Sequence, residues 1–267
     1  MAEPSTPSTI RVSTEGHVVT VTLNRPEVLN AFNRQMCDEF LELWQQVAVD
    51  DDVHVVVLRS EHERAFSTGV DQRSGMAHPE NIWVQTDPGM QLGPKANGVW
   101  KPFVCALHGM VAGGAFYWVN EADIVVCTPD TTFFEPHLTY GMTAAAEPIG
   151  LTHRIPLGEV LRMVLLGLDE RMSAERALQI GLVTEIVERD ELDGRVAELA
   201  RLIAAKPPAA VQGSLRAIWE SLDLGRRDAL ARAHAYTQLG NLVQLGNAIG
   251  KVAPDAMQAK PASWRLR

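Results

Sequence analysis

The spacing of apolar residues divides the first half of the chain into short strands. Apolar and polar residues alternate in residues 10–14 and 17–23 on either side of Glu15-Gly16, which predicts a β-hairpin. Residues 53–58 are too uniformly apolar for the edge of a sheet, so we expect a strand that is covered on both faces. Residues 103–107 form another continuous apolar segment with the length of a buried strand.

Helical periodicity appears between and after these strands. Met36, Phe40, Leu43 and Val47 recur at spacings of 4, 3 and 4 on one helical face, and Asn33 is placed to cap that helix. The pattern also predicts strands over 122–127, 131–134 and 182–187, and helices over 150–166 with a break near Pro156, from Ser173 to Gly181, over 192–205, from Val211 to Leu222, and in the first part of 228–267. Strands and helices interleave, which is typical of the α/β class.

The chain is organised around residues 103–126, where a strand leads through glycines into a helix. Gly109 allows a tight turn after the strand, and Gly113-Gly114 lacks a Cβ that would keep a ligand away from the backbone. We expect a helix from Ala112 to Asn120. A helix start offers unpaired N–H groups, so it suits an anion or a carbonyl oxygen that gains charge. A role in close packing alone is the alternative.

A second glycine turn follows the apolar residues 65–67, in the sequence Ser67-Thr68-Gly69-Val70-Asp71. The segment after it, residues 74–100, has no clear period and carries scattered aromatic and methionine side chains, namely Met76, Trp83, Met90 and Trp100. Such a segment suits a mobile flap over a pocket. A surface loop with ordinary anchoring side chains is the alternative.

Composition narrows the class of protein. The chain of 267 residues is 46% hydrophobic and 21% charged, with a net charge of -9, which argues against binding to nucleic acid. Three cysteines without CxxC spacing (Cys37, Cys105 and Cys127) indicate a reducing compartment, and we expect a cytoplasmic protein. The sequence shows neither a membrane-spanning apolar run nor a secretion leader. Residues 1–9 are polar and rich in proline, so we expect a loose N-terminal tail there.

Several familiar catalytic motifs are missing from the sequence. The absence of GxGxxG argues against a dinucleotide-dependent dehydrogenase, and the absence of GxSxG argues against a serine hydrolase. The sequence also lacks HExxH and paired cysteines, so we expect no metal site.

Ordered motifs between Val18 and Val187 carry a family resemblance. They are Leu23-Asn24-Arg25-Pro26 with Asn30-Ala31, the segment 66–71, the segment from Lys101-Pro102 to Gly109, Gly113-Gly114, Ala122-Asp123, and Arg171-Met172-Ser173-Ala174 with Gly181-Leu182-Val183. In these motifs and their spacing the chain resembles the crotonase (enoyl-CoA hydratase/isomerase) superfamily.

The resemblance implies an architecture and a ligand. The fold would be the ClpP/crotonase-like superhelix of ββα turns, with the acyl-CoA site in residues 10–200 and a C-terminal helical oligomerisation region in residues 201–267. The resemblance also implies a homo-oligomer, a trimer or a hexamer, that acts on an acyl-CoA thioester in fatty acid metabolism. Coenzyme A would enter as part of the substrate, and no separate cofactor is expected.

The resemblance also assigns roles to the two glycine turns. The backbone N–H groups of Val70 and Gly114 would form an oxyanion hole for the thioester enolate, where loss of one donor typically costs ~3 kcal/mol. Valine replaces the usual alanine at position 70, which a backbone role tolerates. The resemblance further implies contacts with the substrate or its CoA moiety from the four residues Ser67, Gly69, Asp71 and Gly113.

The chain departs from the family pattern at both catalytic glutamates. A hydratase of this family carries them where this chain has Tyr117 and His137. A tyrosine, with a pKa near ~10, is a poor base, whereas a histidine, near ~6.5, can act as base or acid. Glu147 lies where some family members carry an extra acid for double-bond shifts. We expect the carboxylate of Glu135 to point away from His137.

These departures argue against simple hydration. The leading hypothesis is an enolate-stabilising acyl-CoA enzyme whose protons are handled by Tyr117, His137 and Glu147. Isomerisation, hydrolysis and decarboxylation stay open. A member of the fold that binds acyl-CoA without catalysis is the alternative from another class.

Overall fold

The structure is a computed structural model that describes residues 7–74, 76 and 87–246. The chain forms two compact units, Met1–Ala205 and Lys206–Arg267. Most of the predicted loose tail, and the part of the predicted flap that includes Trp83, lie outside the described residues.

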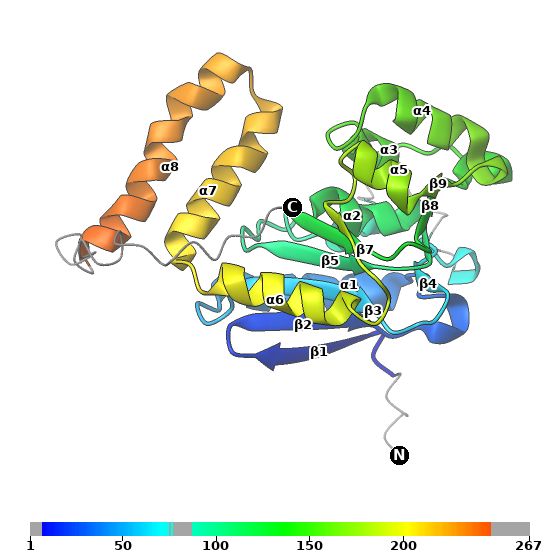
Figure 1. The fold of residues 1–267 in the computed structure, drawn as a ribbon, viewed down its shortest axis with the longest axis horizontal. Coiled ribbons are helices and arrows are strands. Elements are labelled where there is room, and N and C mark those ends of the chain that lie inside the picture. The colour runs from blue at the N-terminus through cyan, green and yellow to red at the C-terminus, as the bar shows by residue number, and fades with distance from the viewer. Residues whose placement is uncertain (1–6, 75, 77–86, 247–267) are drawn as a thin grey trace. The chain divides into compact units, whose positions relative to one another are not determined.

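A six-stranded sheet forms the centre of the first unit (Figure 1). Its order is β1-β2-β3-β5-β7-β10, with bounds Ile10–Glu15, Val18–Leu23, Val55–Ser60, Phe103–Leu107, Ile124–Cys127 and Glu185–Ile186. Strands β1 and β2 pair antiparallel as the predicted hairpin, and all other neighbours pair parallel.

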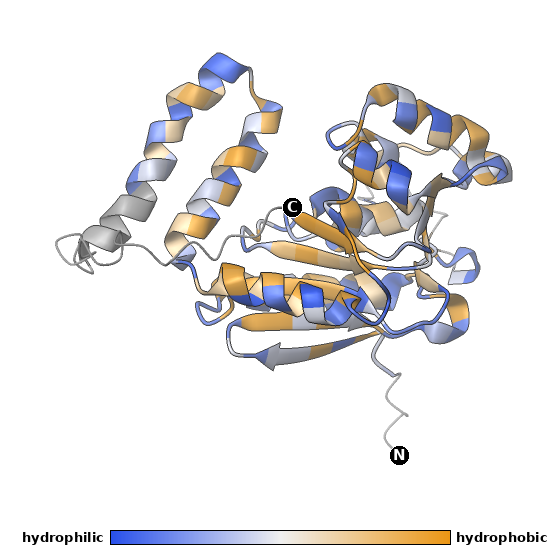
Figure 2. Cartoon of the chain, in the orientation of Figure 1, coloured by the Kyte–Doolittle hydropathy of each residue, from blue (hydrophilic) through white to orange (hydrophobic). Residues whose placement is uncertain are grey.

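Two helices cover opposite faces of this sheet, which explains the continuous apolar strands. Val56 and Leu58 of β3 join the core cluster that includes the buried side chains of α1 (Arg34–Val49). Val55 and Val57, which point to the other face, pack in the cluster that holds Leu192, Val196 and Ala200 of α6 (Leu192–Ala204). Figure 2 shows the inner strands as mainly hydrophobic. The prediction of a strand covered on both faces is confirmed.

A second sheet of four short strands carries the glycine turns. Its order is β4-β6-β8-β9, with bounds Ala65–Ser67, Met110–Ala112, Thr132–Phe134 and Met172–Ser173. The predicted helix from Ala112 to Asn120 is therefore wrong at its start. Ala112 ends β6, a 3-10 turn spans Gly113–Ala115, and α2 covers only Phe116–Glu121. Backbone pairing of β6 with β4 and β8 overrides the helical tendency of these small residues.

Three further helices complete the first unit. The predicted helix with a break near Pro156 is confirmed as α3 (Ala146–Leu151) and α4 (Leu157–Leu166). Ser173 caps α5 (Ala174–Gln179) by accepting a hydrogen bond from Arg176 N at 3.2 Å. Asn33 caps α1 in the same way, from Met36 N at 3.0 Å. Short 3-10 segments connect the elements at Pro26–Val28, Gln72–Ser74, Pro88–Gln91, His137–Tyr140 and Gly167–Asp169.

The second unit contains two helices packed against each other. They are α7 (Pro208–Glu220) and α8 (Arg226–Gly246), joined by a 3-10 turn at Ser221–Asp223. The Tyr236 hydroxyl of α8 donates to the carboxylate of Glu220 on α7. Helix α6 belongs to the first unit, which ends at Ala205. The acyl-CoA core over residues 10–200 and the oligomerisation region over residues 201–267 stay predictions.

Candidate active site

A cavity of about 240 Å³ in the first unit joins the central glycine stretch to the loop that holds His137. Apolar, aromatic and acidic side chains line it, namely Phe32, Val70, Met76, Asp87, Pro88, Tyr117, His137, Thr143, Ala145, Ala146 and Glu147. All three predicted catalytic residues face this one space.

The structure brings the backbone of Gly69, the residue before Val70, close to that of Gly114. A Cβ added to Gly69 would lie 2.7 Å from Gly114 N and 2.9 Å from Ala112 O, so only glycine fits between the two turns. Gly69 also has a φ of +87°, which favours glycine on its own.

The backbone pairing next to Val70 and Gly114 does not use the N–H groups of these two residues. Phe32 N donates to Gly69 O at 2.8 Å, and Asp71 N donates to Phe32 O at 2.8 Å. This bridge uses the residues on either side of Val70, so the Val70 N–H faces away from Phe32. Gly114 is the second residue of its 3-10 turn, where an N–H has no acceptor within the turn.

The carboxylate of Glu135 contacts His137, so the expectation that it points away is wrong. Glu135 Oε1 accepts hydrogen bonds from His137 N, at 3.1 Å, and from the ring at Nδ1. Pro136 adopts a helical conformation (φ -84°, ψ -9°), which turns the chain back so that a side chain reaches the residue two positions later. Glu135 is completely buried, whereas His137 is partly exposed to the cavity.

His137 presents its other ring nitrogen to Glu147. The distance from Nε2 to Glu147 Oε1 is 3.9 Å. Glu147 is the second residue of α3, and its carboxylate is buried. The cavity therefore holds an imidazole with one carboxylate behind it and another in front of it.

Burial and charge shift the pKa values of these groups. The hydrogen bond that the His137 ring donates to Glu135 raises the pKa of His137 above its usual value, because the carboxylate favours the charged ring. Burial raises the pKa of Glu147, since the charged carboxylate loses hydration there. Both groups are thereby suited to proton transfer nearer neutral pH.

Tyr117 takes a different position from the other two. Its hydroxyl donates to Asp87 Oδ2, and its ring lies against Gly89, where a Cβ would overlap it. Burial raises the pKa of Tyr117 well above its usual value, and the negative charges of Glu147 and Asp87 add to this shift. Tyr117 is therefore a hydrogen-bond donor and not a base.

The side chains of Ser67 and Asp71 have internal partners. The buried Ser67 hydroxyl donates to Asn30 O at 2.8 Å and accepts from Gly69 N at 3.2 Å. Asp71 forms an ion pair with Arg25 at 3.0 Å, which holds the loop that contains Val70. Their predicted contacts with CoA stay a prediction.

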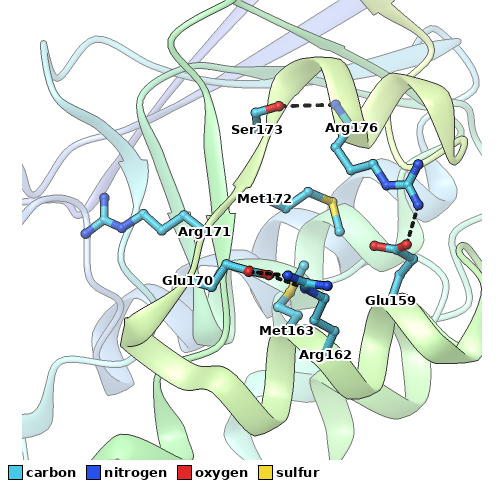
Figure 3. Close-up of a pocket in the computed structure, with 8 residues that line it drawn as sticks. All are labelled: Glu159, Arg162, Met163, Glu170, Arg171, Met172, Ser173 and Arg176. Carbon is cyan, nitrogen blue, oxygen red and sulfur yellow. Dashed lines mark hydrogen bonds and ion pairs between the residues drawn. The ribbon is translucent and has the colours of Figure 1, made fainter.

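A second cavity, of about 340 Å³, lies between α4 and α5 and is lined by charged side chains that are already paired (Figure 3). Arg162 binds Glu170 at 2.6 Å, and Arg176 binds Glu159. Arg171 extends away from the others, with its guanidinium 4.1 Å from the centre of the Phe134 ring. The charged side chains of this cavity have partners within the protein. It therefore differs from the His137 cavity, where Glu147 and His137 face each other beyond hydrogen-bond distance.

In the part of the chain that the structure describes, no group of three or more His, Cys, Asp and Glu side chains could hold a metal ion. None of the described helices is long and apolar enough to cross a membrane.

Comparison with known proteins settles the family. The family model for enoyl-CoA hydratase/isomerase matches residues 13–239. The chain belongs to the enoyl-CoA hydratase/isomerase family. This result confirms the predicted superfamily, the crotonase fold and an enzyme of this family.

Individual relatives catalyse different reactions. The (E)-benzylidenesuccinyl-CoA hydratase of Thauera aromatica is 31% identical over 236 residues, which cover 87% of this chain and 88% of that protein. The 1,2-epoxyphenylacetyl-CoA isomerase of Escherichia coli K12 is 29% identical over 204 residues, covering 72% of this chain and 75% of that protein. The crystal structure of an enoyl-CoA hydratase/isomerase from Mycobacterium paratuberculosis superposes with a TM-score of 0.85 and 31% identity, over 97% of this chain and 99% of that chain.

Sequence reasoning missed two residues of the site. Glu135 was recognised as a neighbour of His137 but not as its partner, although carboxylates commonly bond a backbone N–H two residues later. Asp87 gave no signal, because its contact with Tyr117 joins residues that are far apart in the sequence.

Proposed function

We propose that the protein is an acyl-CoA isomerase that forms a thioester enolate and moves a proton along the acyl chain. The Val70 and Gly114 N–H groups would hold the thioester oxygen, and His137 and Glu147 would carry the proton. The relatives named above are hydratases and isomerases of CoA thioesters, which supports this substrate class.

The amide pair supports enolate chemistry. When a proton leaves the α-carbon, negative charge collects on the thioester oxygen, and fixed N–H donors stabilise it without reorganising. Gly69 allows the two turns to lie close together. The N–H groups of Val70 and Gly114 do not donate in the adjacent backbone pairing.

The observation that carries the proposal is the contact of His137 with Glu135. A buried carboxylate at Nδ1 fixes the ring tautomer and leaves Nε2 as the nitrogen that exchanges protons in the cavity. This is the arrangement that general base catalysis requires of a histidine. Glu147, with its raised pKa, would return or accept the proton at the other position of the acyl chain.

The residue types at the predicted catalytic positions favour a double-bond shift over addition of water. A hydratase of this family carries glutamates where this chain has Tyr117 and His137, so the usual pair of carboxylates that activates a water is replaced.

Deuterium exchange tests the proposal. The protein would be incubated in D2O with 2-enoyl-CoA and 3-enoyl-CoA thioesters, and mass spectrometry would follow label in the acyl chain while chromatography separates the two isomers. We expect interconversion with label incorporation, reduced by about a hundredfold or more in His137→Ala. Tyr117→Phe serves as the comparison and should keep most of the exchange, because Tyr117 is not a base.

Other products would indicate a different reaction. A 3-hydroxyacyl product, free CoA or loss of CO2 would indicate hydration, hydrolysis or decarboxylation. Binding without exchange or turnover would indicate the non-catalytic alternative.

We also propose the homo-oligomer and the cytoplasmic location expected from the sequence. The helices of the second unit support an assembly role, because Ile218, Leu222 and Leu230 are exposed apolar side chains there. Light scattering on the purified protein would distinguish a trimer from a hexamer, and a monomer would refute this proposal.

A further inference from the structure

The charged groups of the His137 cavity are unbalanced. Asp87 and Glu147 contribute carboxylates to its lining, and His137 is the only basic residue among the described lining residues. The positive charge that His137 can carry is already matched by the buried carboxylate of Glu135 behind it. With Asp87 and Glu147 ionised, the cavity therefore presents net negative charge to anything that enters it.

Two arginines of the family motifs, both in the part of the chain that the structure describes, have partners outside the lining of the cavity. Arg25 pairs with Asp71 at 3.0 Å, and Arg171 lies over Phe134.

Most of the other lining residues are apolar. Phe32, Val70, Met76 and Pro88 form the wall beside the polar groups. Such a wall favours an uncharged hydrocarbon group, and burying an unpaired carboxylate against it is costly. Two carboxylates facing a third add repulsion to that cost.

We infer that the acyl pocket selects by charge: it takes acyl groups with an uncharged end and rejects dicarboxylic acyl groups. This inference rests on the proposed function, since it assumes that the acyl chain occupies this cavity. It distinguishes the chain from relatives such as the 2,3-dehydroadipyl-CoA hydratase of Escherichia coli K12, whose name describes a substrate with a second carboxyl group.

Binding of two saturated thioesters tests the inference without needing turnover. Hexanoyl-CoA and adipoyl-CoA have the same number of carbons and differ only in the methyl or carboxylate at the far end. Isothermal titration calorimetry on the full chain, with CoA alone as a reference, should give about tenfold or more weaker binding for adipoyl-CoA. Raising the salt concentration should lower the ratio of the two dissociation constants, because salt screens the repulsion between carboxylates.

A pair of variants locates the repulsion. Asp87→Asn should reduce the ratio of the two dissociation constants by several-fold, because it removes one facing charge while keeping a hydrogen-bond acceptor for Tyr117. Glu191→Gln, an exposed residue at the start of α6 that is not part of the lining, removes the same charge from the protein and should leave the ratio unchanged.

The outcomes separate this inference from the proposed function. Discrimination in binding without isomerisation would sustain the charge selectivity and refute the activity. Isomerisation of hexenoyl-CoA together with equal affinities for hexanoyl-CoA and adipoyl-CoA would refute the selectivity alone. Binding of both thioesters no tighter than CoA would show that the acyl chain does not occupy the cavity, and that result overturns the inference as well.

Discussion

Glu135 Oε1 accepts two hydrogen bonds from a single residue, His137: one from its backbone N–H at 3.1 Å and one at ring atom Nδ1. The first bond fixes the carboxylate, and the second fixes the ring. Because the two residues are separated only by Pro136, the arrangement is local and stiff, and it aims Nε2 at the cavity.

The pH dependence of the proposed activity should report this contact. As a base, His137 must be neutral, so kcat/KM should fall at low pH with a midpoint above the ordinary histidine pKa. Glu135→Gln keeps a hydrogen-bond acceptor and removes the charge that favours the protonated ring. The pKa of His137 should then fall, and the midpoint should move to lower pH by about one unit or more.

Kinetics at a series of pH values would measure this shift. Glu191→Gln is the control, since it removes one surface charge far along the chain and should leave the midpoint in place. An unchanged midpoint in Glu135→Gln, in a variant with native circular dichroism, would show that Glu135 does not position His137.

The proximity of Gly69 to Gly114 makes a second prediction. Alanine at position 69 would press a Cβ on Gly114 N, so Gly69→Ala should lower kcat/KM by about a hundredfold, comparable to the loss of an oxyanion donor. Gly16→Ala is a matched control. Gly16 also has a positive φ, of +55°, but a Cβ there meets nothing within 4 Å.

Both alanine variants should lose stability because of the positive φ, by about 1 kcal/mol from the backbone alone. Only Gly69→Ala should lose activity at a temperature where both proteins are folded. Equal activity in the two variants would argue against an oxyanion hole at this position.

Glu147 and Glu121 provide a comparison of two carboxylates with raised pKa values. Glu147 lies in the cavity, whereas the Glu121 carboxylate accepts hydrogen bonds from the backbone N–H of Lys95 and Ala96. Glu147→Gln should lower kcat by about a hundredfold through loss of a proton carrier. Glu121→Gln should leave kcat within about threefold, because Glu121 is not among the residues that line the His137 cavity. Similar losses in both variants would contradict the role of Glu147.

The stability of the protein should depend on pH through Glu121. Burial raises its pKa from 4.5 to about 7, so the folded state binds this proton more tightly than the unfolded chain does. The resulting stabilisation is fully present below pH 4.5 and is lost as the pH rises through about 7. The free energy of unfolding should therefore fall less over this range in Glu121→Gln than in the unchanged protein.

Urea unfolding at intervals from pH 4.5 to 7.5 would measure the difference between the two proteins. Parallel curves would show that Glu121 titrates alike in the folded and unfolded states. Glu191→Gln again controls for a simple change in net charge.

Local patterns predicted the elements well where they depend on nearby residues. The hairpin before β3, the caps Asn33 and Ser173, and the break near Pro156 in the helix predicted over residues 150–166 are all present, although the first of the two helices begins at Ala146. Each is set by periodicity, by a capping side chain or by a proline, and these act over a few residues. The predicted start of α2 was wrong because Ala112 belongs to strand β6, which pairs with β8, a strand that comes later in the sequence.

The amino-acid sequence alone establishes the class of fold, the family and the residue types at the predicted catalytic positions, Tyr117 and His137. Which carboxylate contacts each of these two side chains depends on the folded backbone. The conformation of Pro136 turns Glu135 toward His137, and folding brings Asp87 to Tyr117 across 30 residues of chain. Such contacts depend on the path of the backbone between the residues, which the spacing of apolar and polar side chains does not specify.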